Sequence, residues 1–187
     1  MSTDNVPHHP TLVQLPTLHP LRHSSDPSRF KYAEIGSISH GTMRTEDLLP
    51  TFLDALTDVA PGHARTIRKE YKHVIDVIEN DPDAASDKDR EDADYLVNEV
   101  LPDALQEHAL PYTYFGSHEG DGADYGFWIS WDAVDDAVRD GSILKLHSGD
   151  PWPKGTRTKY EYVLEINDHG NATLFNPRSR REVWSCV

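Results

Sequence analysis

Hydrophobic residues in the first half of the chain recur at the three- and four-residue spacing of amphipathic helices. Residues 45–59 show this spacing, begin with Thr45 as a good N-cap and carry two acidic residues in the first turn. The same spacing predicts a second helix over residues 60–80 and a third over residues 89–109. An Asp-Pro step separates these two helices, and Pro102 predicts a kink in the third.

After Pro111 the pattern changes to the alternation of strands, with a short helix over residues 130–142 that Ser130 caps and Gly141 ends. The sequence Asn-Asp-His-Gly-Asn at residues 167–171 is a strong hairpin signal. A weaker alternation over residues 31–39 indicates a further strand or a lead-in segment. The expected strands lie at residues 112–116, 125–130, 143–147, 159–167, 171–175 and 181–187.

Helices followed by a run of hairpin-connected strands are typical of an α+β fold. We therefore predict that residues 30–187 form a single α+β domain, with an antiparallel sheet of about five strands packed on two to three helices. Aromatic residues should supply much of the core and its rim, and these are Trp128, Trp131, Trp184, Phe115, Phe127 and Tyr162.

Residues 1–29 are rich in Pro, His and Ser, and their five prolines interrupt any regular element. We expect an extended N-terminal arm or tail here. Its apolar part, residues 11–21, is suited to lie against the domain or against a second subunit, which would make the protein a homo-oligomer through the arm.

The formal charge of −14 favours a basic protein partner and argues against direct binding to nucleic acid or to an anionic membrane. Residues 79–107 hold eleven acidic residues and two basic ones, and residues 117–140 hold seven and one. This excess indicates either solvated helix faces or a surface that mimics the phosphate row of DNA. The C-terminal part is basic by contrast, through Lys154, Arg157, Lys159, Arg178, Arg180 and Arg181.

Cellular location is indicated by three features of the sequence. One cysteine, Cys186, excludes a disulfide within the chain, no stretch of about 18 apolar residues spans a membrane, and the N-terminus lacks a signal-peptide pattern. We therefore expect a cytoplasmic protein.

Candidate chemistry is concentrated in the glycine-rich segment 116–126, which holds His118, Glu119, Asp121 and Asp124. Imidazole and carboxylate groups are metal ligands, but the spacing matches no zinc or calcium motif. The alternative interpretation is a hairpin, because Gly and Asp favour tight turns. In either case the polar segment between two aromatic strands is a candidate binding surface.

Two other segments carry candidate residues. His40 and Arg44 precede a helix start, where anions bind, and Asp168 with His169 could act as a base and its orienting group. Turn and capping roles explain both segments as well. The alternative function is therefore a small hydrolase or metal-dependent enzyme in which His118, Asp121 and Asp124 meet His40 and His169. The sequence contains no P-loop, G-x-S-x-G, H-E-x-x-H, C-x-x-C or dinucleotide fingerprint, and we expect no cofactor.

Three segments, residues 38–56, 111–128 and 163–175, together resemble a family of small uncharacterised proteins encoded in bacterial genomes, phages and plasmids. The resemblance covers residues 32–59 and 111–187, and leaves out the arm and part of the second and third helices. It implies no catalytic residues. It favours a non-enzymatic interaction or accessory protein of a mobile element, which is the leading hypothesis, with the acidic face binding a basic protein.

Overall fold

The computed structural model of the chain describes residues 30–153 and 159–187, and Lys31–Val187 forms one compact unit. The predicted arm over residues 1–29, its role in a homo-oligomer, and Lys154 and Arg157 lie outside the described residues. Helices precede most of the strands, so the α+β class is confirmed. None of the helices in the described segments is both long and apolar enough to cross a membrane.

The helical half differs from the prediction mainly at two joints. Helix α1 (Thr45–Val59) has the predicted bounds, whereas the second predicted helix is two helices, α2 (Pro61–Glu70) and α3 (Lys72–Asn80), because the backbone at Tyr71 leaves the helical region (φ −102°, ψ 23°). The third consists of α4 (Asp87–Tyr95), a π-helical turn (Leu96–Val100) and α5 (Leu101–Gln106). Pro102 has no N–H to donate, and the predicted kink takes the form of this wider turn directly before it.

Two predicted caps differ from the structure. Arg44 occupies the N-cap of α1, and Thr45 donates its hydroxyl to Asp94 (2.5 Å) instead. Ser130 holds the N-cap position of α6 (Trp131–Asp140), but its side chain makes no capping hydrogen bond. Gly141 ends α6 as predicted, in the left-handed conformation (φ 86°) that glycine adopts without strain.

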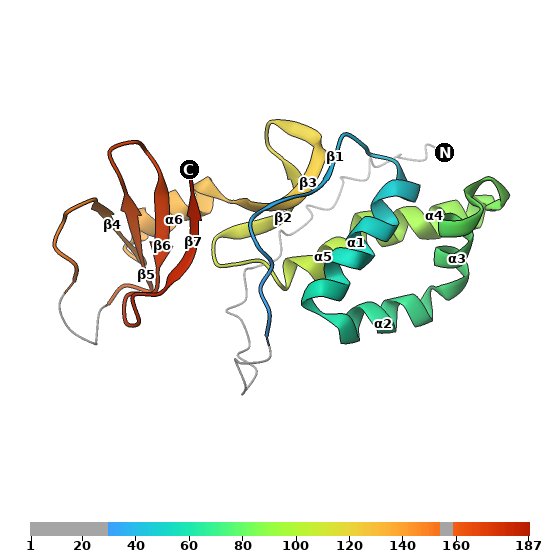
Figure 1. The fold of residues 1–187 in the computed structure, drawn as a ribbon, viewed down its shortest axis with the longest axis horizontal. Coiled ribbons are helices and arrows are strands. Elements are labelled where there is room, and N and C mark those ends of the chain that lie inside the picture. The colour runs from blue at the N-terminus through green and yellow to red at the C-terminus, as the bar shows by residue number, and fades with distance from the viewer. Residues whose placement is uncertain (1–29, 154–158) are drawn as a thin grey trace, which may run out of the picture. The chain divides into compact units, whose positions relative to one another are not determined.

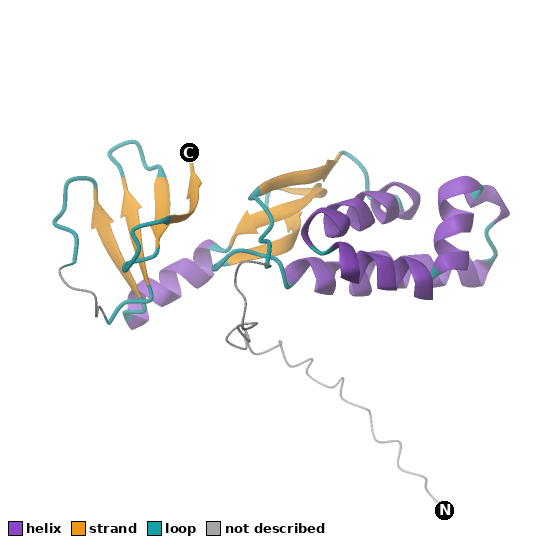
Figure 2. Ribbon diagram, turned by 60° about the horizontal axis from the view of Figure 1, so that its bottom comes forward, coloured by secondary structure: helices purple, strands orange, loops and turns teal. Residues whose placement is uncertain are grey.

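The strands form two sheets rather than one (Figures 1 and 2). Strands β1 (Gly36–His40), β2 (Thr113–His118) and β3 (Asp121–Ile129) form an antiparallel sheet in the order β1-β3-β2. Strands β4 (Ile143–His147), β5 (Tyr162–Ile166), β6 (Ala172–Phe175) and β7 (Glu182–Cys186) form the second sheet in chain order.

The prediction of one wholly antiparallel sheet of about five strands is therefore wrong. Helix α6 interrupts the run of strands after β3, so that the following strands pair among themselves. Strands β4 and β5 pair in parallel, because residues 148–161 form a connection of about a dozen residues, long enough for the crossover that parallel strands need.

Each sheet has its own hydrophobic core. In the first, the fully buried ring of Phe52 on α1 lies edge-on to Phe115 (5.0 Å between centroids) and contacts Tyr125 (5.5 Å). In the second, Trp184 is buried and donates its indole N–H to the Pro111 carbonyl (2.8 Å). Of the six predicted core aromatics, Phe115, Phe127 and Trp184 are buried, Trp128 and Tyr162 are half-buried, and Trp131 is 41% exposed.

Candidate functional sites

The glycine-rich segment is a tight hairpin between β2 and β3. Strand β2 ends at His118 and β3 begins at Asp121, so only Glu119 and Gly120 form the turn. The Gly120 N–H donates to His118 Nδ1 (3.0 Å), and the Ala123 N–H donates to Asp121 Oδ1 (3.0 Å). The hairpin interpretation is therefore confirmed, and the polar segment is much more regular than a long loop.

Strand β1 brings His40 to this hairpin. His40 is aligned with Asp124 on β3, and its Nδ1 lies 3.6 Å from Asp124 Oδ2 and 3.9 Å from Asp121 Oδ2. The hydroxyl of Ser37, also on β1, donates to Asp124 Oδ1 (2.5 Å). Asp124 thus receives a hydrogen bond from one β1 side chain and approaches another, and the cluster ties β1 to β3.

The order of these groups differs from that of a serine hydrolase. Such an enzyme needs an imidazole between the serine and the carboxylate, so that the imidazole removes the hydroxyl proton. Here the carboxylate of Asp124 lies between Ser37 and His40, and the hydroxyl is bound to an acceptor that does not pass the proton on. The His40 side chain is also 69% exposed, and across the described residues no group of three or more His, Cys, Asp and Glu is placed to hold a metal ion.

The other candidates lie apart from this cluster or have partners of their own. The exposed His118 packs edge-on against Trp128 (4.7 Å), and Glu119 is exposed in the turn. His169 is exposed in the turn between β5 and β6 of the other sheet, where its N–H donates to Asn167 Oδ1 (2.9 Å). Arg44 donates from Nε to Glu46 (2.9 Å). The structure thus brings together His40, Asp121 and Asp124 but not all five residues of the proposed catalytic cluster.

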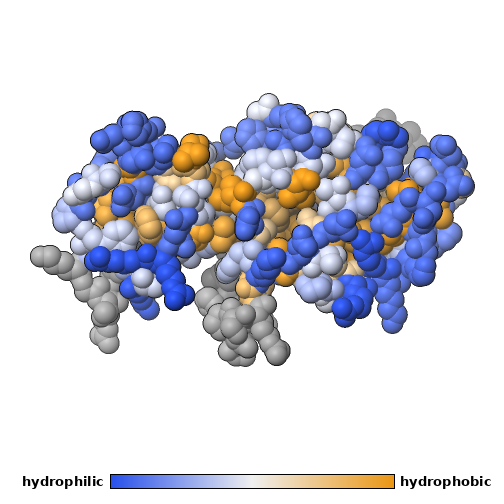
Figure 3. All heavy atoms as spheres, viewed as in Figure 1, coloured by the Kyte–Doolittle hydropathy of each residue, from blue (hydrophilic) through white to orange (hydrophobic). Residues whose placement is uncertain are grey.

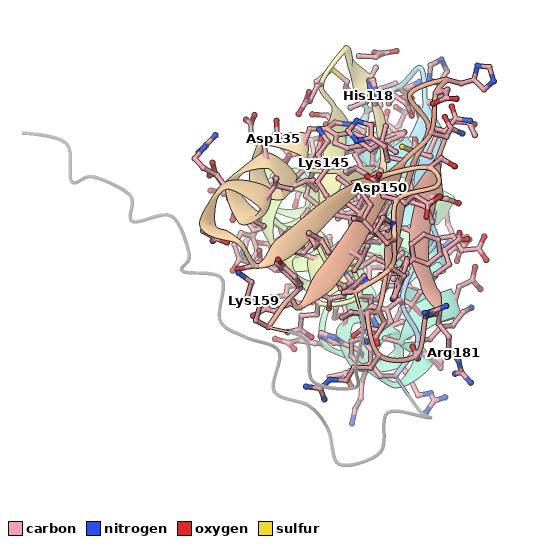
Figure 4. The ribbon with its side chains drawn as sticks, turned by 90° about the vertical axis from the view of Figure 1, so that its left-hand side faces the viewer. His118, Asp135, Lys145, Asp150, Lys159 and Arg181 are labelled. Atoms are coloured by element: carbon pink, nitrogen blue, oxygen red, sulfur yellow. The ribbon has the colours of Figure 1, made fainter. Side chains whose placement is uncertain are left out.

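The basic character of the C-terminal part is modest and dispersed. Residues 142–187 hold seven basic and five acidic residues, whereas residues 30–141 hold nine and 25. Figure 4 shows Lys145, Lys159 and Arg181 at separate points around the second sheet. Two cations cover aromatic rings of the chain itself, Arg180 on Trp152 (5.3 Å) and Lys159 on Tyr160 (5.0 Å).

The acidic face predicted within residues 79–107 takes the form of a row of exposed residues along α4 and α5. Every fourth residue from 87 to 107 is exposed, and five of these six are acidic. The signal that would have identified the row is this four-residue spacing, which is visible without a structure. We call it the acidic ridge, and its members are Asp87, Glu91, Tyr95, Glu99, Asp103 and Glu107.

The π-helical turn helps to keep the ridge on one side of the helix. Four residues advance an α-helix by about 40° more than one full turn, so five such steps would rotate the row by about 200°. The wider turn Leu96–Val100 holds one extra residue and takes back about 100° of this rotation. The ridge therefore runs obliquely over about 30 Å instead of winding around the helix.

The ridge carboxylates have no partner within the part of the chain that the structure describes, whereas their neighbours on α4 do. Asp92 binds Lys88 (2.9 Å), Asp94 accepts from Thr45, and Asp89 forms a capping box with Ser86 and lies 3.4 Å from His73. Hydrogen bonds from Ser86 lower the pKa of Asp89. Within residues 30–153 and 159–187, no ion pair or hydrogen bond involves the side chains of Asp87, Glu91, Glu99, Asp103 and Glu107. Hydrophilic residues cover most of the face drawn in Figure 3 over α2–α4.

No protein-family model, curated protein or solved structure matches the chain. The resemblance to a family from bacteria, phages and plasmids therefore stays a prediction.

Proposed function

We propose that this chain is a non-enzymatic interaction protein whose acidic ridge binds a basic surface of a partner protein. The observation that carries the proposal is the unpaired state of the five ridge carboxylates among the described residues, beside neighbours that are paired. An accessory role for a mobile element, inferred from the resemblance, belongs to the same proposal. A location in the cytoplasm is also part of the proposal, and the single cysteine of the chain is compatible with it.

The arrangement is unfavourable for the isolated chain. Asp87 and Glu91, Glu99 and Asp103, and Asp103 and Glu107 are like-charge pairs at the i,i+4 spacing, and each such pair destabilises a helix by about 0.2–0.5 kcal/mol. Lys or Arg side chains of a partner would turn this repulsion into attraction. The repulsion among Glu99, Asp103 and Glu107, with which no cation of the described residues forms an ion pair, is the physical reason to regard the ridge as a binding surface.

The spacing of the ridge favours a basic helix over strict mimicry of DNA. Its positions are about 6 Å apart along the axis, the same spacing as Lys or Arg residues placed every fourth position on a partner helix. One DNA strand carries a charge about every 3.4 Å, roughly twice that density. The ridge thus has the negative charge and the linear arrangement of a phosphate row, but not its charge density.

The test is binding of a defined probe, a fluorescent alanine-based helical peptide with lysine at every fourth position. The double variant Glu99→Lys with Asp103→Lys removes the centre of the ridge. Its matched control, Asp135→Lys with Asp168→Lys, changes the net charge by the same amount at two exposed positions outside the ridge. Anisotropy titrations at several salt concentrations give the affinities.

We expect the ridge variant to weaken binding at least tenfold, the control to change it little, and salt to weaken binding to the wild type. Equal losses in the two variants would mean that net charge alone attracts the peptide. That result would contradict the proposal.

A further inference from the structure

Tyr95 interrupts the carboxylates of the acidic ridge near its middle. It is the last residue of α4, its side chain is 55% exposed, and Glu91 and Glu99 stand one helical turn before and after it. Tyrosine is among the residue types enriched at the surfaces where proteins meet. The ring and its two flanking carboxylates therefore form a distinct feature within the ridge.

A second tyrosine lies beside this feature. Tyr71, at the joint between α2 and α3, is half-buried and packs against the first core. The contact of His73 Nε2 with Asp89 Oδ1 (3.4 Å) fixes α3 along α4. Burial raises the pKa of Tyr71, and the nearby Glu70, Tyr95 and Asp92 raise it further. Tyr71 is therefore near enough to Tyr95 and to two carboxylates for their charges to raise its pKa.

The chain's own cations leave the Tyr95 ring uncovered in the described segments. Lys88 binds Asp92 and Lys72 binds Asp76, each four residues along its own helix. The two cation–π contacts found in these segments involve Tyr160 and Trp152 of the C-terminal part. A cation from a partner therefore has an aromatic surface to bind, with carboxylates on either side of it.

We propose that Tyr95, with Glu91 and Glu99, is a site for an arginine side chain of the basic partner. This inference depends on the proposed function and specifies the chemistry of its partner. A guanidinium group is planar, stacks on an aromatic ring and donates in-plane hydrogen bonds to a carboxylate, so it satisfies the ring and a glutamate together. A lysine ammonium gains the charge but cannot stack in this way. A phosphate group would be repelled by the same glutamates.

The test compares two alanine-based helical peptides of equal length and charge, one with arginine and one with lysine at every fourth position. We expect the wild-type chain to bind the arginine peptide about two- to fivefold more tightly, the range for an exposed cation–π contact. Tyr95→Leu should remove this preference and weaken arginine-peptide binding more than lysine-peptide binding. Tyr95→Phe keeps the ring and should retain the preference, while Glu91→Gln with Glu99→Gln should weaken both peptides. Circular dichroism verifies that each variant is folded.

The possible results separate this inference from the proposed function. Equal binding of both peptides to the wild type, or an arginine preference that persists in Tyr95→Leu, would overturn the arginine site and leave the ridge proposal standing. Failure of both peptides to bind the wild type would overturn both proposals.

Discussion

Replacement of Gly126 by alanine should displace strand β1 from the first sheet. Gly126 is buried in β3, opposite Ser37, where the backbone of β1 comes unusually close. A Cβ atom at this position would lie 2.9 Å from both the Gly36 carbonyl carbon and the Ser37 Cα, and closer still to the Gly36 oxygen. These are backbone atoms, so no side-chain rotation relieves the contact.

The structure gives the scale of the effect. Ordinary contacts begin at 3.4 Å and the Gly36 oxygen is the closest of these atoms, so β1 must move outward by about 1 Å or more, which strains its pairing with β3. Overpacking of this kind costs about 1–3 kcal/mol. In a chain of this size each kcal/mol lowers Tm by about 2–4 °C, and we expect a decrease of about 2–12 °C.

The same strand provides the control. Gly122 also lies in β3, but a Cβ there would meet nothing within 4 Å, so Gly122→Ala should leave Tm nearly unchanged. Calorimetry on the wild type and both variants measures the difference. If Gly126→Ala melts at the same temperature as Gly122→Ala, the close approach of β1 to β3 does not constrain the fold and the reasoning fails.

Three further predictions concern stability. Asp103→Lys should raise the free energy of unfolding by about 0.8–2 kcal/mol at low salt, because two repulsive i,i+4 pairs become attractive. Urea titration at low and high salt measures this, and no change would show that the ridge carboxylates do not interact. Ser86→Ala should lower the same quantity by about 0.5–2 kcal/mol through loss of the capping box of α4; an unchanged urea midpoint would contradict this. Burial raises the pKa of Tyr112 to about 12 from an ordinary value of 10.0, so the unfolded chain loses the phenol proton first and stability should fall as pH rises above about 10. Tyr112→Phe should flatten this decline in urea titrations at pH 9–12, and an equally steep decline would exclude Tyr112 as its source.

Local sequence signals predicted where helices and strands lie better than they predicted which strands pair with each other. The bounds of α1 follow from the spacing of its apolar residues. The end of α6 at Gly141 follows because glycine adopts the left-handed backbone conformation without strain. The division into two sheets depends on which strands pair, and pairing joins residues far apart in the chain, such as His40 and Asp124. Neither the parallel β4–β5 pair nor the close approach at Gly126 has a local signature.

The candidate site, too, depends on contacts between residues far apart in the chain, which the sequence does not show. The residue types of the hairpin suggested that His40 meets Asp121 and Asp124, and the structure places these three together. The sequence did not show that Asp124 would bind Ser37, an arrangement that changes the chemistry of the cluster. The sequence predicts an acidic face within residues 79–107 but not its arrangement as a row along the helix. The acidic excess was counted along the chain, whereas the ridge depends on spacing and on a helix that is not uniformly α.

The π-helical turn sets the rotational phase between the two ends of one long helical rod. Before it Ala93 faces the core, within it Leu96 and Val97 do, and after it Leu101 and Leu105 do. If the same residues formed a regular α-helix instead, everything after the turn would be rotated by about 100° relative to everything before it. Leu105 would then leave the core at the same time as the second half of the ridge turned toward it, so the buried and exposed faces of this rod can change only together.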